Sequence, residues 1–325
     1  QPGQAQTAVQ GYIADAVCDV YLDDPDNRLI VMWMHEPDAS QHAYGLGAPQ
    51  MTDALRKVDA CVAQVLGELD RRGLRDQFDI FFISDHGHST VRAHATLREY
   101  LERAAAEIGS PLPPLATASD YIYAAPGTAE PSAAELTPLV EWLQAQPWVG
   151  AMLAGRADLC ALPNVFALED VWGGATNARR PLLAISPTWS HAVNEYGVAG
   201  DVQTLTTQGA LRSSHGSASP YDLHANLIAN GPSFRQGVRS EVPTGAIDLL
   251  PTLLHILDIS APAPLQGRVW WELLAQAQGE PGVVRDKVLM PEQAATSGAS
   301  PRLVVHHVGE ARYLHGAFVG DQTWT

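Results

Sequence analysis

The sequence predicts an α/β protein with a mostly parallel central sheet flanked by helices, and three observations lead to this fold class. Two continuous apolar runs, at residues 28–34 (RLIVMWM) and 78–84 (FDIFFIS), have the pattern of strands buried on both faces. Between them, apolar residues recur at spacings of three and four from Met51 to Leu69, which predicts a helix ending near Gly73. A strand, a helix and a second strand in this order form a right-handed crossover unit.

The remaining elements are predicted with less regular patterning, within one domain that spans residues 1–325. The polar opening at residues 1–11 (QPGQAQTAVQG) is predicted as a loop. Residues 90–187 are interrupted often by Pro and Gly, and we expect an irregular elaboration or cap inside the domain. Apolar patterns within it and beyond predict strands at 121–125, 149–155, 181–187 and 223–231, and helices at 133–146 and 244–259. Pro251 should kink or restart the second helix, and the tail after Gly279 is weakly patterned.

Composition narrows the class of partner. The formal net charge of −16 argues against nonspecific binding to nucleic acid or to anionic membranes. It leaves a small anionic substrate open, because a bound metal ion can reverse the local field. We expect no membrane span, since no apolar stretch approaches about 18 residues. The three cysteines have no metal or redox spacing.

Carboxylates and imidazoles follow both predicted strands. The segment MHEPDASQHAYG places Asp38 four residues before His42, and SDHGHS places Asp85 next to His86. Much later, SSHGSASPYD places His215 in a loop between small residues. Ligands of open α/β sheets collect beyond the carboxyl ends of the strands, so we expect these five side chains at one sheet edge.

Two Asp and three His are the ligand types that suit Zn²⁺, Mn²⁺ or a similar ion. Two ions about 4 Å apart need roughly six ligands, so five leave a two-metal site one ligand short. Each segment alone also has a structural explanation: a capped loop at Asp38, or a strand-to-turn transition in which Gly87 takes a positive φ. We assign the other histidines to surface or packing roles, and single out His88 among them because it lies two residues after a proposed ligand.

At these segments the chain resembles a known family. EPDASQHAYGLGAP, ISDHGHS and SSHGSASPYDLHANLIANGPSF resemble, in order, three motifs of the type I phosphodiesterase/nucleotide pyrophosphatase family, of the alkaline phosphatase superfamily. GAIDLLPTLLHILDI followed by PAPLQGR resembles its closing segment, so the resemblance spans roughly residues 28–274. It implies an alkaline-phosphatase-like fold and two divalent metal ions, most consistent with Zn²⁺. By motif, Asp38, His42 and His215 would hold one ion, and Asp85 and His86 the other.

The sequence departs from this family at the nucleophile. The family's Thr or Ser nucleophile and its remaining carboxylate ligand precede the first motif, but only 27 residues precede Arg28 here, and Thr7 stands alone in a polar segment. Ser89 and Thr90 follow the second motif, yet the family pattern gives them no such role. The catalytic nucleophile is therefore unassigned. We expect a domain incomplete at its N-terminus, the C-terminal portion of a longer enzyme, with little or no activity by itself.

The resemblance implies metal-dependent hydrolysis of phosphodiester or pyrophosphate bonds in a small phosphate ester. Three alternatives use the same scaffold: a phosphomonoesterase, a phosphonate hydrolase or a sulfatase. The sulfatase is disfavoured because no C/S-x-P-x-R context is present. A fourth alternative is a catalytically silent metal-binding module. Localisation stays open between periplasmic, secreted and cytoplasmic, and so does the oligomeric state.

Overall fold

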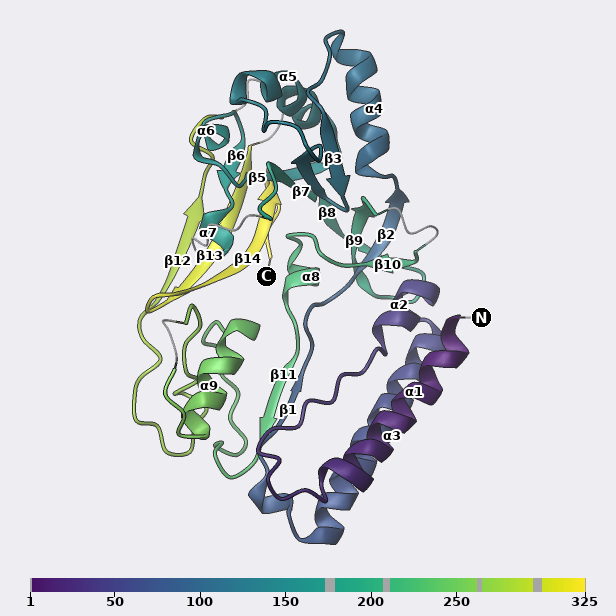
Figure 1. Ribbon diagram of the computed structural model, residues 1–325, viewed down its shortest axis with the longest axis vertical. Coiled ribbons are helices and arrows are strands. Elements are labelled where there is room, and N and C mark those ends of the chain that lie inside the picture. Colours follow the sequence, from purple (N-terminus) through teal and green to yellow (C-terminus); the bar gives the residue numbers. More distant parts are fainter. Residues whose placement is uncertain (1, 173–178, 207–210, 262–264, 295–299, 325) are drawn as a thin grey trace.

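A computed structural model of the chain describes residues 2–172, 179–206, 211–261, 265–294 and 300–324 (Figure 1). The α-helices are α1 (Pro2–Ala16), α2 (Asp38–Tyr44), α3 (Pro49–Arg72), α4 (Leu97–Ile108), α5 (Ala133–Gln144), α6 (Ala157–Cys160), α7 (Glu169–Trp172), α8 (Pro220–Leu223) and α9 (Leu249–Ile256). Three further short turns of helix are η1 (Val17–Tyr21), η2 (Arg75–Gln77) and η3 (Ala246–Asp248). No helix in these described ranges is long and apolar enough to cross a membrane.

The strands form four sheets. They are β1 (Ile80–Ile83), β2 (Ser89–His94), β3 (Leu115–Ala118), β4 (Tyr121–Ala124), β5 (Val149–Ala154), β6 (Val165–Ala167), β7 (Leu183–Pro187), β8 (Trp189–Val193), β9 (Ala199–Thr204), β10 (Ser213–Ser214), β11 (Leu227–Asn230), β12 (Val284–Leu289), β13 (Pro301–Val308) and β14 (Ala311–Val319). The sheet orders are β3-β4-β7-β5-β6, β10-β2-β9-β8, β12-β13-β14 and β1-β11.

The main hydrophobic core lies where α4 and α5 cover the five-stranded sheet, at the top of Figure 1. Helix α5 begins at a capping box in which Ser132 and Glu135 bond each other's backbone N–H groups. Its Leu139 and Leu143 are fully buried against strand residues such as Ile122. Each buried Leu contributes about 1.5–3 kcal/mol, so this core holds the upper half together.

The predicted helix over residues 51–69 is confirmed as α3, whose C-cap, Gly73, has the left-handed φ of 67°. The strand predicted at residues 28–34 is wrong, because this segment is extended but pairs with no strand in the described part of the chain. Its side chains alternate between partly buried and exposed positions. Ile30 and Met32 pack on the cluster that α3 helps to form, whereas Val31 is 75% and Trp33 60% exposed. A continuous apolar run shows that a segment can be buried, but pairing needs a neighbouring strand.

The mostly parallel sheet is also corrected, because only the pairs β2/β9 and β5/β6 are parallel in the described sheets. The other pairs, including β1 with β11, run antiparallel. Short connections explain two of these pairs: Ser119 and Asp120 alone link β3 to β4, and Gly309 and Glu310 link β13 to β14. Such tight turns join antiparallel neighbours, while parallel strands need long crossovers. The α/β class itself is correct.

Both ends of the chain are more regular than predicted. The opening, predicted as a loop, is helix α1, which packs against α3. Residues 28–34 and α1 to α3 therefore form the lower right of Figure 1. The weakly patterned tail forms the three-stranded sheet β12-β13-β14, with Leu303 and Val305 buried on one face of β13. Pro251 lies near the start of α9, which is a separate helix after η3.

Candidate metal centre

Helix α2 presents the first two candidate ligands. Asp38 is the first helical residue and His42 lies one turn later, so both side chains lie on one face of the helix. The His42 Nε2 atom is 3.3 Å from Asp38 Oδ1. The buried carboxylate of Glu36 accepts the Ser40 N–H at 3.0 Å and satisfies a free donor in the first turn.

The segment between β1 and β2 contributes three more side chains. Asp85 is half exposed, and its Oδ1 lies 3.5 Å from His86 Nε2. His88 is almost fully buried, and its Nε2 lies 2.8 Å from Asp38 Oδ1. Gly87 between them approaches the Tyr221 carbonyl so closely that a side chain there would collide with it. The absence of a Cβ at Gly87 therefore lets the two histidines reach the centre.

His215 comes from the loop between β10 and α8 and completes the group. Its Nε2 atom lies 3.6 Å from Asp38 Oδ1, and its ring stacks on that of His86 with centroids 3.5 Å apart. The His86 Nε2 atom is 3.9 Å from the same carboxylate oxygen. One oxygen of Asp38 therefore has four imidazole Nε2 atoms within 3.9 Å.

Main-chain carbonyls orient two of the imidazoles. The His42 Nδ1–H donates to the Ser213 carbonyl at 2.7 Å, and the His86 Nδ1–H donates to the Gly87 carbonyl at 2.9 Å. A neutral imidazole that donates through Nδ1 carries its lone pair on Nε2, the atom that faces Asp38; the hydrogen bond to Asp38 raises the pKa of His42, so this ring has to release its Nε2 proton to bind a metal ion. Second-shell acceptors of this kind fix the tautomer and the ring orientation of metal-ligating histidines.

The protonation states suit a cation site. Burial by itself would raise the pKa of Asp38, but hydrogen bonds from His42 and His88 hold it well below its usual range. Burial, with the neighbouring imidazoles of His86 and His88, lowers the pKa of His215 to about 4. Asp38 is therefore anionic and His215 neutral at pH 7, which are the forms that bind metal ions.

The predicted residues meet, with one addition. Asp38, His42, His88 and His215 each offer a ligand atom within 4.8 Å of the others. Asp85 and His86 lie beside this group as a second pair. His88, which we singled out among the histidines given surface or packing roles, is the residue that the predicted ligand set lacks. The signal was its position two residues after His86, because alternate residues of an extended segment lie on the same side.

Asp222 is a second residue that the sequence analysis missed. It is 2% exposed, and its carboxylate accepts Ser89 Oγ–H at 2.5 Å and the Ser217 N–H and Oγ–H at 3.0 and 2.6 Å. Its main-chain carbonyl accepts the Gly87 N–H at 2.7 Å. Asp222 therefore ties the segment that carries His86 and His88 to the loop that carries His215.

Neither hydroxyl after the second motif is free. Ser89 is fully buried and donates to Asp222, and Thr90 Oγ1 accepts the Asn194 side-chain amide at 3.1 Å. Thr7 lies within α1. The structure therefore adds no support for Ser89 or Thr90 as a nucleophile.

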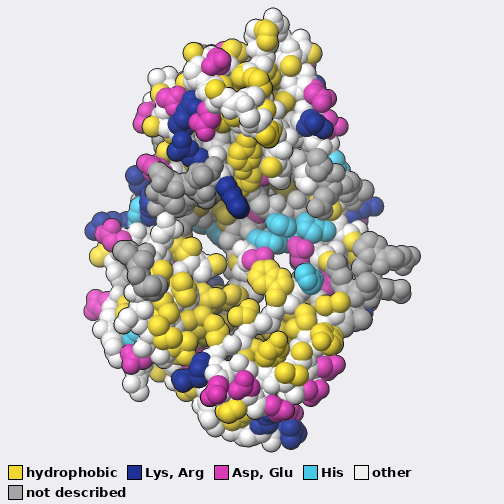
Figure 2. Space-filling view, viewed as in Figure 1, with side chains coloured by type: hydrophobic (Ala, Val, Ile, Leu, Met, Phe, Trp, Pro, Cys, Tyr) yellow, Lys and Arg dark blue, Asp and Glu magenta, His cyan; other side chains and the backbone are white. Residues whose placement is uncertain are grey.

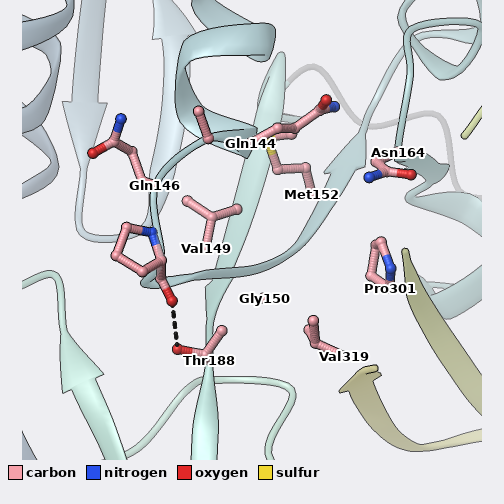
Figure 3. A pocket seen from close by; sticks show the side chains of 11 residues that line it. Gln144, Gln146, Val149, Gly150, Met152, Asn164, Thr188, Pro301 and Val319 are labelled. Atoms are coloured by element: carbon pink, nitrogen blue, oxygen red, sulfur yellow. Dashed lines mark hydrogen bonds between the residues drawn. The ribbon is translucent and has the colours of Figure 1, made fainter. Parts of the chain in front are cut away.

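A polar cleft of about 180 Å³ adjoins the centre and includes His42, His215, Ser214 and Asp120 in its lining. Figure 2 shows histidines exposed in the middle of this face, with acidic side chains close by. A larger cleft of about 380 Å³ lies elsewhere, between the β5 region and the strands β13 and β14 (Figure 3). Its lining contains only neutral side chains, such as Gln144, Met152 and Asn164, so acid–base or metal chemistry is expected at the smaller cleft.

The fold and the site together define a class: an α/β protein with an Asp/His group able to hold a metal ion. Residues 2–145 match the family model of the type I phosphodiesterase/nucleotide pyrophosphatases. The chain is 31% identical over 75 residues to ectonucleotide pyrophosphatase/phosphodiesterase family member 7 of Homo sapiens, which is 23% of this chain and 16% of that protein. It is 22% identical over 252 residues to bis(5'-adenosyl)-triphosphatase ENPP4 of Pongo abelii, which is 75% of this chain and 47% of that protein.

These matches show that the chain is similar to the type I phosphodiesterase/nucleotide pyrophosphatases, the family that its motifs resemble. The matched regions cover less than half of the length of these curated relatives.

Proposed function

We propose that this chain carries the metal-binding part of an enzyme that hydrolyses phosphodiester or pyrophosphate bonds. The observation that carries the proposal is the convergence of four imidazole Nε2 atoms, from three separate segments, on Asp38 Oδ1. The match of residues 2–145 to the family model and a relative named as a bis(5'-adenosyl)-triphosphatase support the reaction class.

The donor set fits divalent transition-metal ions, and we propose two Zn²⁺. Asp38, His42 and His215 would hold one ion, with Asp85 and His86 at the other. His88 already contacts Asp38 and is an additional candidate ligand for the first ion. When bound, divalent ions supply Lewis-acid polarisation of a phosphoryl oxygen.

The chain's own residues orient the ligands and position a proton. Ser213 and Gly87 fix two imidazoles through their carbonyls, and Asp222 holds the loops together. Asp120, in the lining of the cleft, has a pKa raised to about 6 by burial. Its carboxyl can therefore hold or release a proton near neutral pH, which is the range in which general acid–base groups operate.

The substrate class follows from the cleft and the charge. A cleft of about 180 Å³ suits a small phosphate ester, and the net charge of −16 disfavours nucleic acid. Because no Ser or Thr matches the family nucleophile, we expect these 325 residues alone to bind metal but to turn over slowly. Pre-steady-state burst kinetics from this chain would overturn that expectation.

The test combines Zn²⁺ binding with hydrolysis. Calorimetric titration of the chain with Zn²⁺ should show binding that His215→Ala and His42→Ala weaken by at least tenfold. The matched control is His255→Ala, which removes an imidazole of α9 that packs against the ring of Trp271. Unchanged Zn²⁺ affinity in both ligand variants would overturn the site.

The second arm separates the reaction classes. A complete enzyme containing this chain should cleave bis(p-nitrophenyl) phosphate with added Zn²⁺, and His215→Ala should lower the rate by orders of magnitude. Preference for p-nitrophenyl phosphate, a phosphonate ester or an aryl sulfate would overturn the diesterase assignment in favour of the matching alternative. Metal binding without hydrolysis of any of the four would favour the silent metal-binding module.

A further inference from the structure

A second group of histidines lies away from the candidate metal centre and shares no residue with it. His224 directly follows α8, His306 lies on β13 and His315 on β14, with Asp286 on the neighbouring strand β12. Figure 1 shows α8 beside the C-terminal sheet, and α8 contacts β14 directly. The fold therefore brings together imidazoles that are up to 91 positions apart in the sequence.

Two ring nitrogens in this group face each other at a distance typical of shared ligands. His224 Nε2 and His315 Nδ1 are 3.2 Å apart. Two imidazoles on one tetrahedral Zn²⁺, with bonds of about 2.0–2.1 Å, have their nitrogens about 3.3–3.4 Å apart. Only small movements would admit an ion between these rings. A single N–H···N hydrogen bond also fits this distance, and the experiment below distinguishes the two.

His306 is the third imidazole beside this pair, and its side chain would have to turn to share an ion with the other two, because the three rings do not place one nitrogen each within 4.8 Å of the others. Its ring centroid lies 4.6 Å from that of His315, and its Nδ1–H donates to Asp286 Oδ1 at 2.6 Å. That bond leaves the Nε2 lone pair available. A carboxylate on the outer nitrogen of a histidine is the usual second-shell partner of a metal-bound imidazole.

The backbone is shaped to produce this group. Val304 pairs with Gly316 and Val305 with Leu314, so His315 is the extra residue of a β-bulge. Bulges redirect side chains and are frequent beside functional sites. Gly316 allows α8 to approach, since a Cβ there would lie 2.9 Å from Pro220 Cγ.

We propose that His224, His306 and His315 form a second transition-metal site, with Asp286 as the outer carboxylate, that takes Zn²⁺, Co²⁺, Ni²⁺ or Cu²⁺. Imidazole is the ligand type these ions prefer, whereas Mg²⁺ and Ca²⁺ prefer oxygen. The site does not depend on the proposed hydrolase activity.

The experiment uses the tag-free chain with the first site, including both of its proposed ion positions, disabled by His42→Ala, His86→Ala, His88→Ala and His215→Ala. Calorimetric titration of this variant with Zn²⁺ should still show one binding site. Adding His224→Ala should abolish it or weaken it at least tenfold, and Asp286→Asn should weaken it by about 10–100-fold. His224 is exposed, so its replacement leaves the fold intact.

The matched control is His307→Ala on the same strand, which pairs with Arg285 and Arg312 across the sheet and should leave Zn²⁺ binding unchanged. A second readout comes from Trp324, whose ring centroid is 5.2 Å from that of His224. Ni²⁺ should quench its fluorescence, and Trp324→Phe should remove the quenched component. No Zn²⁺ binding in the first-site variant, or binding that His224→Ala leaves intact, would overturn the proposal and leave the hydrogen bond as the explanation.

Discussion

Replacement of Asp120 by Asn should change how stability depends on pH. The carboxyl lies beside β4 in the cleft next to His42 and His215, and burial raises its pKa to about 6 from an ordinary value of 3.8. In the folded state it therefore binds a proton more tightly than in the unfolded state. Its favourable contribution is fully present below pH 3.8 and is lost as the pH rises through about 6.

The magnitude follows from the pKa shift. Two pKa units at 1.36 kcal/mol each give a loss of up to about 3 kcal/mol between pH 4 and pH 7. Asn cannot ionise and does not show this loss. The free energy of unfolding of Asp120→Asn, relative to wild type, should therefore increase across this pH range by up to that amount.

Urea unfolding in the presence of EDTA, from pH 4 to pH 7.5, measures this difference without metal effects. Asp26→Asn, at an exposed position after η1, controls for the loss of one negative charge. A difference between Asp120→Asn and wild type that stays constant with pH, or that decreases as the pH rises, would refute the argument.

Three further predictions concern the site and the exposed edge. Zn²⁺ at about 100 times its Kd should raise the free energy of unfolding by about 2.7 kcal/mol. The variant His215→Ala should show a smaller gain. Equal gains in the wild type and in this variant would contradict the ligand assignment. Gly87→Ala should lower the free energy of unfolding in urea by about 1–3 kcal/mol, because the added Cβ would collide with the Tyr221 carbonyl. If this variant is as stable as the wild type, the loop can move away from residue 87. Val31→Lys should change the free energy of unfolding by less than about 0.5 kcal/mol, because residue 31 is 75% exposed on a segment that pairs with no strand in the described chain. The same change should reduce self-association measured by light scattering, because a charge on an exposed edge disfavours pairing with another chain. Unchanged scattering would show that this segment does not mediate self-association.

Local signals predicted much of the regular structure. The apolar spacing and Gly73 identified α3, and the apolar pattern of residues 133–146 identified α5. Pairing partners could not be predicted in this way. Residues 28–34 have the composition of a strand, but whether a strand forms depends on a neighbour that no local pattern describes.

The candidate site was predictable in part. Asp38, His42 and His215 were identified as ligand-type side chains expected at one sheet edge, each in a segment that resembles a family motif, and the structure brings them together. His88 was singled out for its position two residues after His86 but was left out of the ligand set, because no motif gave it a role. The group at His224 and His315 could not be predicted, since a β-bulge and a four-residue helix bring its members together.

The acceptors behind His42 and His86 are main-chain oxygens, at Ser213 and Gly87. Such an acceptor belongs to the path of the chain and not to any particular side chain. Substitution at position 213 would therefore leave the oxygen that orients His42 in place. Divergence could reshape the surrounding cleft, and with it the choice of substrate, without turning these two rings out of alignment.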